Sequence, residues 1–277
     1  MAEITAAAVR AFREKTGLPL MDCKRALTEA NGDEAKAIEA LRKAGEKLEA
    51  IRADRATEFG RFGLYYGLDK KTGAIVELKC ESAPVTQNVE FIQLANDLAE
   101  QLATGPGAAT ADELLAQPSP SKPEITLAQQ KADLFNRIRE VFNVGRLARI
   151  ESSCGGYSHN AKTVAGVLLA VEGGTEEVAK DICMHVAAMR PTALHVADLD
   201  PVLVAKEREI LREAALKEGK PEAIVDKMVE GRLRSFYAEK VLCEQPFVKD
   251  DKVTVGNHAE QNKMKVKQFV HWELGKE

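Results

Sequence analysis

The chain has 277 residues, of which 45% are hydrophobic and 30% charged, and its formal net charge is −4. A chain of this length can hold two or three small domains with cores of their own, and the slight acidic excess disfavours direct binding of nucleic acid. The five cysteines are odd in number, lie far apart and form no CxxC pair, so the sequence supports neither a disulfide framework nor a zinc knuckle and predicts reduced, mostly buried thiols.

The hydropathy of the sequence argues against a membrane-spanning or secreted protein. The sequence contains no apolar run near the ~20 residues of a membrane-spanning helix, and its first residues lack the apolar core of a signal peptide. We therefore expect a soluble, cytoplasmic protein that makes no contact with a membrane.

The pattern of residues 1–44 predicts three short helices. Breaks fall at Thr16-Gly17 and Asn31-Gly32, and Asp33 is the expected N-cap of the third helix. The second helix opens with an apolar pair, Leu20-Met21, that charged side chains surround. Periodicity alone also allows these two side chains to belong to a core.

The pattern changes twice after the third helix. Residues 45–58 are rich in Glu, Lys, Arg and Ala and have few apolar anchors, which indicates a helical or flexible linker. Residues 64–66 and 74–78 then flank a polar turn and predict a β-hairpin. Two helices are expected next, at 88–103 and at about 125–143, with loops rich in glycine and proline between them.

An internal repeat is also visible. Residues 64–78 align with residues 156–170 at an offset of 92, and both segments contain a tyrosine, a polar turn with lysine and an apolar strand. A helix follows each segment and carries an aspartate before an apolar residue, Asp97 in the first copy and Asp181 in the second. The repeat predicts two related α/β subdomains, although two unrelated hairpin–helix units would give the same pattern.

Residues 200–236 predict an antiparallel helical hairpin. Two charged helices, 201–217 and 222–236, are joined by Gly219-Lys220-Pro221, where glycine can end one helix and proline can start the next. The apolar side chains expected between the two helices are Val202, Leu203, Ile210 and Leu211 from the first and Ile224, Val225, Met228 and Leu233 from the second. A closing strand at 266–274 contains the only tryptophan, Trp272.

The sequence shows no sign of covalent or acid–base catalysis. It has no GxxxxGK[ST] or GxGxxG phosphate-binding motif and no HExxH motif or carboxylate–histidine cluster for a metal. Cys183 and His185 lie on different faces of one predicted helix, so we expect a buried, hydrogen-bonded histidine and no catalytic pair. The expected protein acts through its surfaces, without a cofactor, a metal or catalytic residues.

Several segments match the signature of one protein family in the same order. Residues 9–27 (VRAFREKTGLPLMDCKRAL) match its N-terminal signature, and Asn31-Gly32-Asp33 fits the start of the third helix. Tyr157-Ser158-His159 fits its second core subdomain, and Gln245-Pro246-Phe247-Val248 occurs near the C-terminus, as in the family. The chain thus resembles, almost end to end, the bacterial translation elongation factor Ts family, which exchanges nucleotide on the GTPase elongation factor Tu.

The resemblance implies an α+β fold with two related hairpin-plus-helix core subdomains and an inserted antiparallel helical hairpin. The implied parts are an N-terminal three-helix (UBA-like) module at 1–44, a linker at 45–58, core subdomain N at 59–150, core subdomain C at 151–199 and 237–277, and a coiled-coil hairpin at 200–236.

The resemblance also implies the function. The chain is expected to be a guanine-nucleotide exchange factor that binds elongation factor Tu, promotes release of GDP and Mg²⁺, and allows GTP reloading during polypeptide elongation. The residues expected to bind the GTPase are Arg13, Leu20, Met21, Lys24, Ile138, His159 and Val248. The expected exchange loop consists of Glu81, Ser82, Ala83, Pro84 and Val85. No direct contact with nucleic acid is expected.

Two alternatives come from other classes of protein. One is a chaperone-like partner that binds elongation factor Tu with weak exchange activity. The other is an RNA-binding translation protein, which would use the basic cluster Lys131, Arg137, Arg139, Arg146 and Arg149.

The exchange loop departs from the family pattern. The family usually carries Thr-Asp-Phe here, with the phenylalanine as a wedge and the aspartate toward the Mg²⁺ region, whereas this chain has Ser82-Ala83-Pro84. Proline fixes its own φ angle near −65° but cannot fill the cavity that an aromatic ring fills. We therefore expect Ile138 and His159 to carry more of the exchange activity in this chain.

Overall fold

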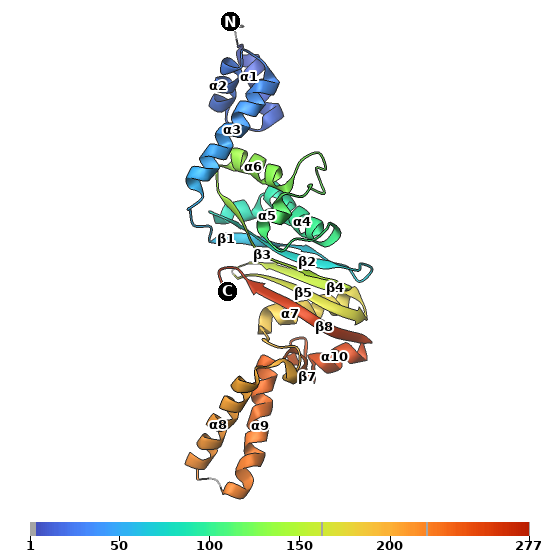
Figure 1. Cartoon of the computed structure of the whole chain (residues 1–277). Coiled ribbons are helices and arrows are strands. Elements are labelled where there is room, and N and C mark those ends of the chain that lie inside the picture. The colour runs from blue at the N-terminus through green and yellow to red at the C-terminus, as the bar shows by residue number, and fades with distance from the viewer. Residues whose placement is uncertain (1–3, 162, 220, 277) are drawn as a thin grey trace. The chain divides into compact units, whose positions relative to one another are not determined.

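The structure is a computed structural model that describes residues 4–161, 163–219 and 221–276 (Figure 1). Its mixture of helices and strands confirms the α+β class. The chain divides into two compact units, Met1–Gly63 with Ile75–Arg149 and Leu64–Ala74 with Ile150–Glu277. Among the described residues, none of the helices combines the length and the apolar character needed to cross a bilayer.

The first unit begins with the three predicted helices, α1 (Ala6–Thr16), α2 (Leu20–Glu29) and α3 (Glu34–Arg52). Gly17 ends α1 in the left-handed region, with φ 68°, and its N–H donates to the carbonyl of Arg13 at 2.8 Å. The Asp33 carboxylate accepts the N–H of Lys36 at 3.1 Å, which confirms the predicted N-cap. The buried side chains that hold the three helices together are Val9, Phe12, Cys23, Ala26, Leu27, Ala37 and Leu41.

The predicted boundary at residue 44 does not coincide with a break in secondary structure. Helix α3 continues to Arg52, because Glu, Lys, Arg and Ala are good helix formers and because its second half contacts α6 (Leu127–Ile138). At Gly45 the two helices approach so closely that a Cβ atom would overlap the side-chain amide of Asn136. One turn later, Glu49 forms an ion pair with Lys131.

The sheet of the first unit has the strand order β1-β2-β3. Its strands are β1 (Phe59–Tyr65), β2 (Gly73–Cys80) and β3 (Phe142–Ile150). The helices drawn over one face of this sheet in Figure 1 are α4 (Val89–Thr104), α5 (Ala111–Leu115) and α6. The predicted hairpin and the helix at 88–103 are confirmed.

The predicted helix at 125–143 is wrong in its second half. Helix α6 ends at Ile138 because Arg139 adopts the left-handed conformation, with φ 67°, and the chain then enters β3. Helical spacing continues through Leu134, Ile138 and Phe142, so periodicity alone could not locate this end.

A buried carboxylate joins three segments of the first unit. Asp97 of α4 accepts hydrogen bonds from Gln93 at 2.8 Å, from Gln130 of α6 at 2.7 Å and from the hydroxyl of Ser121 in the loop before α6. Only 1% of Asp97 is exposed, so these donors replace the water that the carboxylate loses on folding.

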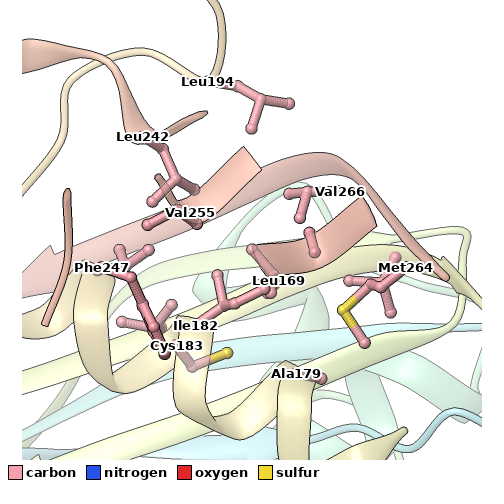
Figure 2. Close-up of a cluster of buried hydrophobic side chains, with 14 residues drawn as sticks. Leu169, Ala179, Ile182, Cys183, Leu194, Leu242, Phe247, Val255, Met264 and Val266 are labelled. Carbon is pink, nitrogen blue, oxygen red and sulfur yellow. The ribbon is translucent and has the colours of Figure 1, made fainter. Parts of the chain in front are cut away.

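The second unit contains an antiparallel sheet of order β4-β5-β8. Its strands are β4 (Cys154–Asn160), β5 (Val164–Gly173) and β8 (Met264–Glu273), and β8 confirms the predicted closing strand. Helices α7 (Glu176–Met189) and α10 (Val255–Gln261) contact this sheet. Figure 2 shows the core between them, where Leu169 of β5 lies close to Ile182 and Cys183 of α7.

The two units share an order of elements. A β-hairpin is followed by a helix, and a third strand then pairs with the second strand of the hairpin. One set of these parts is β1–β2, α4 and β3, which belongs to the first unit except for the hairpin end Leu64–Ala74, and the other set is β4–β5, α7 and β8 in the second unit. This order matches the internal repeat, whose second strands, β2 and β5, hold the buried apolar runs. The exact subdomain boundaries stay predictions.

Short elements complete the described chain. They are the 3-10 helices η1 (Ala83–Gln87), η2 (Val196–Asp198) and η3 (Leu242–Glu244) and the strands β6 (Pro246–Phe247) and β7 (Asp250–Thr254).

Helices α8 (Pro201–Lys217) and α9 (Glu222–Lys240) form the antiparallel pair seen in Figure 1. In the turn between them Gly219 has φ 74°, Lys220 lies outside the described residues, and Pro221 is the N-cap residue of α9. The sequence predicted Pro221 at the first helical position, and the structure places it one residue before that position.

The prediction of which side chains pack between these two helices is only partly correct. The buried side chains are Ala215, Val225, Val229 and Leu233, with Leu211, Phe236 and Tyr237 packed against them. Most of the remaining expected side chains are exposed, namely Val202, Leu203, Ile210 and Ile224. Ion pairs such as Arg208–Glu230 and Arg212–Asp226 also link the helices and fix which faces meet.

The buried carboxylate of Asp97 gives the first testable prediction. In Asp97→Asn an amide N–H₂ replaces one acceptor oxygen and faces hydrogen-bond donors, so the free energy of unfolding should fall by about 2 to 3 kcal/mol. Urea unfolding measures this change. Glu100→Gln, at an exposed carboxylate of the same helix, is the matched control, and an equal loss in both variants would contradict the role of Asp97.

Candidate functional site

Helix α2 presents an apolar pair to solvent. Leu20 is 45% exposed and Met21 is 69% exposed, because Cys23, Ala26 and Leu27 occupy the face of α2 that is buried. These exposures exclude the interpretation that Leu20 and Met21 belong to the core.

Charged side chains accompany the apolar pair. Lys24 lies one turn after Leu20 and is exposed, and Arg13 of α1 is exposed as well. Met21 and Lys24 line a shallow surface groove together with Arg25, Thr28 and Glu29. An apolar centre with a charged rim is typical of a protein-binding surface.

The expected exchange loop follows β2 directly. Ala83 and Pro84 are exposed at the start of the 3-10 helix η1, whereas Val85 is buried. Neither exposed side chain is large, so the loop carries no aromatic wedge and no carboxylate at these two positions.

Two reciprocal contacts fix the start of this loop. The Glu140 carboxylate accepts both the N–H of Ser82, at 3.0 Å, and its hydroxyl, at 2.6 Å. In return, the Glu81 carboxylate accepts the N–H of Val141 at 2.7 Å and is paired with Arg55 at 3.0 Å. Two neighbouring residues of the loop are thereby joined to two neighbouring residues that follow α6.

Electrostatics agree with these contacts. Burial raises the pKa of Glu81, but the hydrogen bond from Val141 and the charge of Arg55 outweigh it and hold that pKa below the usual value. Glu81 is therefore ionised at neutral pH. Burial, with a smaller effect of the Glu140 charge, raises the pKa of the Cys80 thiol to about 12, which leaves this thiol neutral.

Ile138 is the last residue of α6 and is partly buried. The next residue, Arg139, donates from its guanidinium to Asp22 of α2 at 2.7 Å, and its carbonyl accepts from Arg52 of α3 at 2.7 Å. The structure therefore places Ile138 beside a short segment that bonds to α2, to α3 and to the exchange loop.

His159 lies in strand β4, where it pairs with Ala165 of β5. Its Nδ1 atom is 3.0 Å from the hydroxyl of Tyr157, two residues earlier on the same face of the strand. The imidazole is partly buried, so His159 is not a fully solvated side chain.

Val248 is 49% exposed in the turn between β6 and β7, and a buried histidine holds its backbone. Its N–H donates to Nδ1 of His185 at 3.2 Å, while Nε2 of His185 lies 2.9 Å from the Gln245 side-chain oxygen. Since Nδ1 accepts, Nε2 carries the proton and donates to Gln245. The prediction that His185 is buried and hydrogen-bonded is confirmed, but its contact with Val248 had no signal in the sequence.

Burial lowers the pKa of His185 below its usual value, despite the hydrogen bond to Gln245, which raises it. The imidazole is therefore neutral at neutral pH. The residues that the structure describes contain no group of three or more His, Cys, Asp or Glu side chains placed to hold a metal ion, and the five cysteines are unpaired with one another.

Of the expected contact residues, Arg13, Leu20, Met21, Lys24, Ile138 and the exchange loop all lie in the first unit, whereas His159 and Val248 lie in the second. Sequence reasoning missed the polar groups that hold these residues, Asp22, Arg139 and Glu140 in the first unit and His185 in the second. The expected contact residues came from the resemblance to the family, which did not point to these polar partners.

Comparison with known proteins identifies the family. The sequence model of the family Elongation factor TS matches residues 84–276. The chain belongs to this family. Proteins named Elongation factor Ts from Bordetella petrii (strain ATCC BAA-461 / DSM 12804 / CCUG 43448) and Azoarcus sp. (strain BH72) are each 42% identical to it, over 278 and 282 residues, with 99% of this chain and 92% of the relative covered. The protein of the same name from Thioalkalivibrio sulfidiphilus (strain HL-EbGR7) is 38% identical over 276 residues, with 98% and 92% covered.

Membership of the elongation factor Ts family confirms the resemblance seen in the sequence. It also confirms the prediction of a nucleotide-exchange factor that works in translation elongation. The full-length relatives extend the similarity across α1, α2 and α3, which precede the residues that the family model matches. The roles of individual contact residues stay predictions.

The second prediction concerns pH. Because the pKa of folded His185 lies below the ~6.5 of an unfolded chain, the unfolded state binds a proton first as the pH falls. The contribution of His185 to the free energy of unfolding should be fully present above about pH 6.5 and should decrease as the pH falls below that value. Urea midpoints at about pH 7.5 and 5.5 should therefore differ less in His185→Gln than in the wild type. The exposed His195→Gln should keep the wild-type difference, and an unchanged pH dependence in His185→Gln would contradict the prediction.

Proposed function

We propose that this chain is a guanine-nucleotide exchange factor that binds elongation factor Tu in the cytoplasm, promotes release of GDP and Mg²⁺, and so allows GTP to bind. The observation that carries the proposal is similarity along nearly the whole chain to proteins named Elongation factor Ts, at 42% identity. Such a factor forms and breaks no covalent bond, so it needs no catalytic residue of its own.

The physical requirement is differential binding. The factor must bind the nucleotide-free GTPase more tightly than the GDP-bound form, and by linkage GDP must weaken the binding of the factor by the same ratio. Exposed apolar side chains suit this task because their burial stabilises the complex without attracting the nucleotide.

The first unit supplies the contact surfaces that we favour. Leu20 and Met21 are the apolar anchors on α2, with Lys24 and Arg13 as charged neighbours. The exchange loop, Glu81 to Val85, and Ile138 add the contacts that disturb the nucleotide site of the GTPase. In the second unit, His159 and Val248 are the proposed contacts.

A second candidate function is binding of elongation factor Tu with only weak exchange. The exposed Ala83 and Pro84 favour it, because neither side chain can act as an aromatic wedge. The RNA-binding alternative is disfavoured, because the basic side chains of the cluster are engaged within the chain. Their partners are Glu49 for Lys131, Glu90 for Arg137, Asp22 for Arg139 and Glu77 for Arg146, and two backbone carbonyls for Arg149.

The third prediction tests the function itself. Release of a fluorescent GDP analogue from the cognate elongation factor Tu should accelerate when this chain is added. Complex formation without acceleration would favour the second candidate. No complex at all would contradict both.

The fourth prediction tests the apolar pair on α2. Met21→Ala should weaken binding to elongation factor Tu by about 1 to 2 kcal/mol, or roughly 5- to 30-fold in Kd, because a buried anchor is lost. Titration calorimetry or the concentration dependence of GDP release measures this effect. Ile51→Ala, which removes an apolar side chain that is 79% exposed on α3, is the matched control and should bind normally.

The fifth prediction concerns the residues expected to compensate for the altered loop. Ile138→Ala and His159→Ala should each slow GDP release at saturating factor by about 10-fold, the scale of one lost contact of ~1.4 kcal/mol. Release at the wild-type rate in both variants would show that neither residue carries the exchange.

A further inference from the structure

The segment Arg139–Val141 makes more polar contacts to distant parts of its unit than its length suggests. It lies between α6 and β3, and each of its residues bonds outside the segment, Arg139 to Asp22 and Arg52, Glu140 to Ser82, and Val141 to Glu81. Side-chain and backbone hydrogen bonds thus tie three consecutive residues to partners that lie 58 to 117 positions away in the sequence.

The contact between Glu140 and Ser82 is the most specific of these. Both oxygens of one carboxylate are used, one for the N–H of Ser82 at 3.0 Å and one for its hydroxyl at 2.6 Å. A charged acceptor gives short and strong hydrogen bonds, and two bonds to one residue fix its orientation as well as its position. Because Ser82 immediately precedes η1, its orientation sets the direction in which Ala83 and Pro84 leave the sheet.

The same segment is also tied to the apolar pair on α2. Arg139 can reach Asp22 because its left-handed backbone, with φ 67°, turns the chain sharply after α6. Asp22 stands directly after Met21, and the exposed fractions of the two paired side chains are 22% for Asp22 and 29% for Arg139. This pair is partly shielded from solvent, so it is screened less than an ion pair on an open surface.

The exchange loop has small side chains at its exposed positions, so its effect depends on where its backbone lies. Ala83 and Pro84 bring little surface to bury, so the loop cannot gain much from contacts that form after it moves. A loop of this kind acts through a backbone that is already in place when the GTPase arrives, because ordering it during the encounter would cost free energy. The affinity of the complex, in contrast, comes from the apolar anchors on α2.

We propose that Glu140 is a positioning residue for nucleotide exchange, which holds Ser82 and thereby fixes the exchange loop, through Arg139, relative to the binding surface of α2. The inference rests on the proposed function. It assigns the two surfaces different tasks, binding for α2 and displacement of the nucleotide for the loop.

Kinetics of GDP release separate these tasks. In Ser82→Ala and in Glu140→Gln, the maximal release rate at saturating factor should fall roughly 10-fold, while the half-saturating concentration should change by less than about 3-fold. Ser82→Thr keeps both the N–H and the hydroxyl, so its maximal rate should exceed that of Ser82→Ala. Both substitutions weaken the same contact between Ser82 and Glu140. The double variant Ser82→Ala/Glu140→Gln should therefore release GDP no more slowly than the slower of the two single variants.

Glu113→Gln is the matched control. Glu113 also accepts a backbone N–H, that of Ala109 at 2.8 Å, in a loop that contains none of the expected contact residues. This variant should exchange nucleotide normally. Wild-type maximal rates in both Ser82→Ala and Glu140→Gln, or a change only in the half-saturating concentration, would overturn the proposal.

Amide hydrogen exchange of the free protein provides a readout that does not depend on the GTPase. Glu140→Gln should speed exchange in residues 80–88 about 10-fold and leave other segments unchanged, whereas Glu113→Gln should not. Unchanged protection in residues 80–88 would overturn the positioning role. If the wild type fails to accelerate GDP release, the proposed function falls and the role of Glu140 in exchange falls with it, while hydrogen exchange still decides whether Glu140 holds the loop.

Discussion

The left-handed turn at Arg139 is the constraint on which much of the first unit depends. It ends α6 and sends the chain into β3. It also places three consecutive residues where their side chains or backbone groups bond to α2, to α3 and to the exchange loop. A non-glycine residue in this conformation costs roughly 1 kcal/mol, and hydrogen bonds to Asp22 and from Arg52 stabilise it. The sheet, the exchange loop and the N-terminal helices therefore share one anchoring point.

Both units use a buried or half-buried polar group to hold the backbone of an exposed residue that we propose as a contact. In the first unit the carboxylates of Glu81 and Glu140 hold the exchange loop, and in the second unit the imidazole of His185 holds the backbone of Val248. In each case the exposed side chain is small or apolar, and hydrogen bonds hold the backbone at or next to it. Proteins that act by surface complementarity gain affinity when such surfaces are ordered in advance.

Local features were predictable from the sequence and contacts between distant residues were not. The breaks at Gly17 and Asp33 followed from capping chemistry, and the exposed Leu20 and Met21 followed from a family signature that periodicity alone could not interpret. Strand β3 was missed because its first residues continue the spacing of α6. Glu140 and His185 carry no motif, since their partners lie 58 and 63 residues away.

Gly45 illustrates how this architecture limits protein engineering. Replacing a helical glycine by alanine is a common route to a more thermostable protein, because glycine costs a helix about 1 kcal/mol relative to alanine. Here α3 and Asn136 of α6 leave no space for a methyl group, so the substitution would push the two helices apart. Consensus or library designs for this chain should therefore keep position 45 fixed and look for helix-stabilising changes on the solvent-facing side of α3.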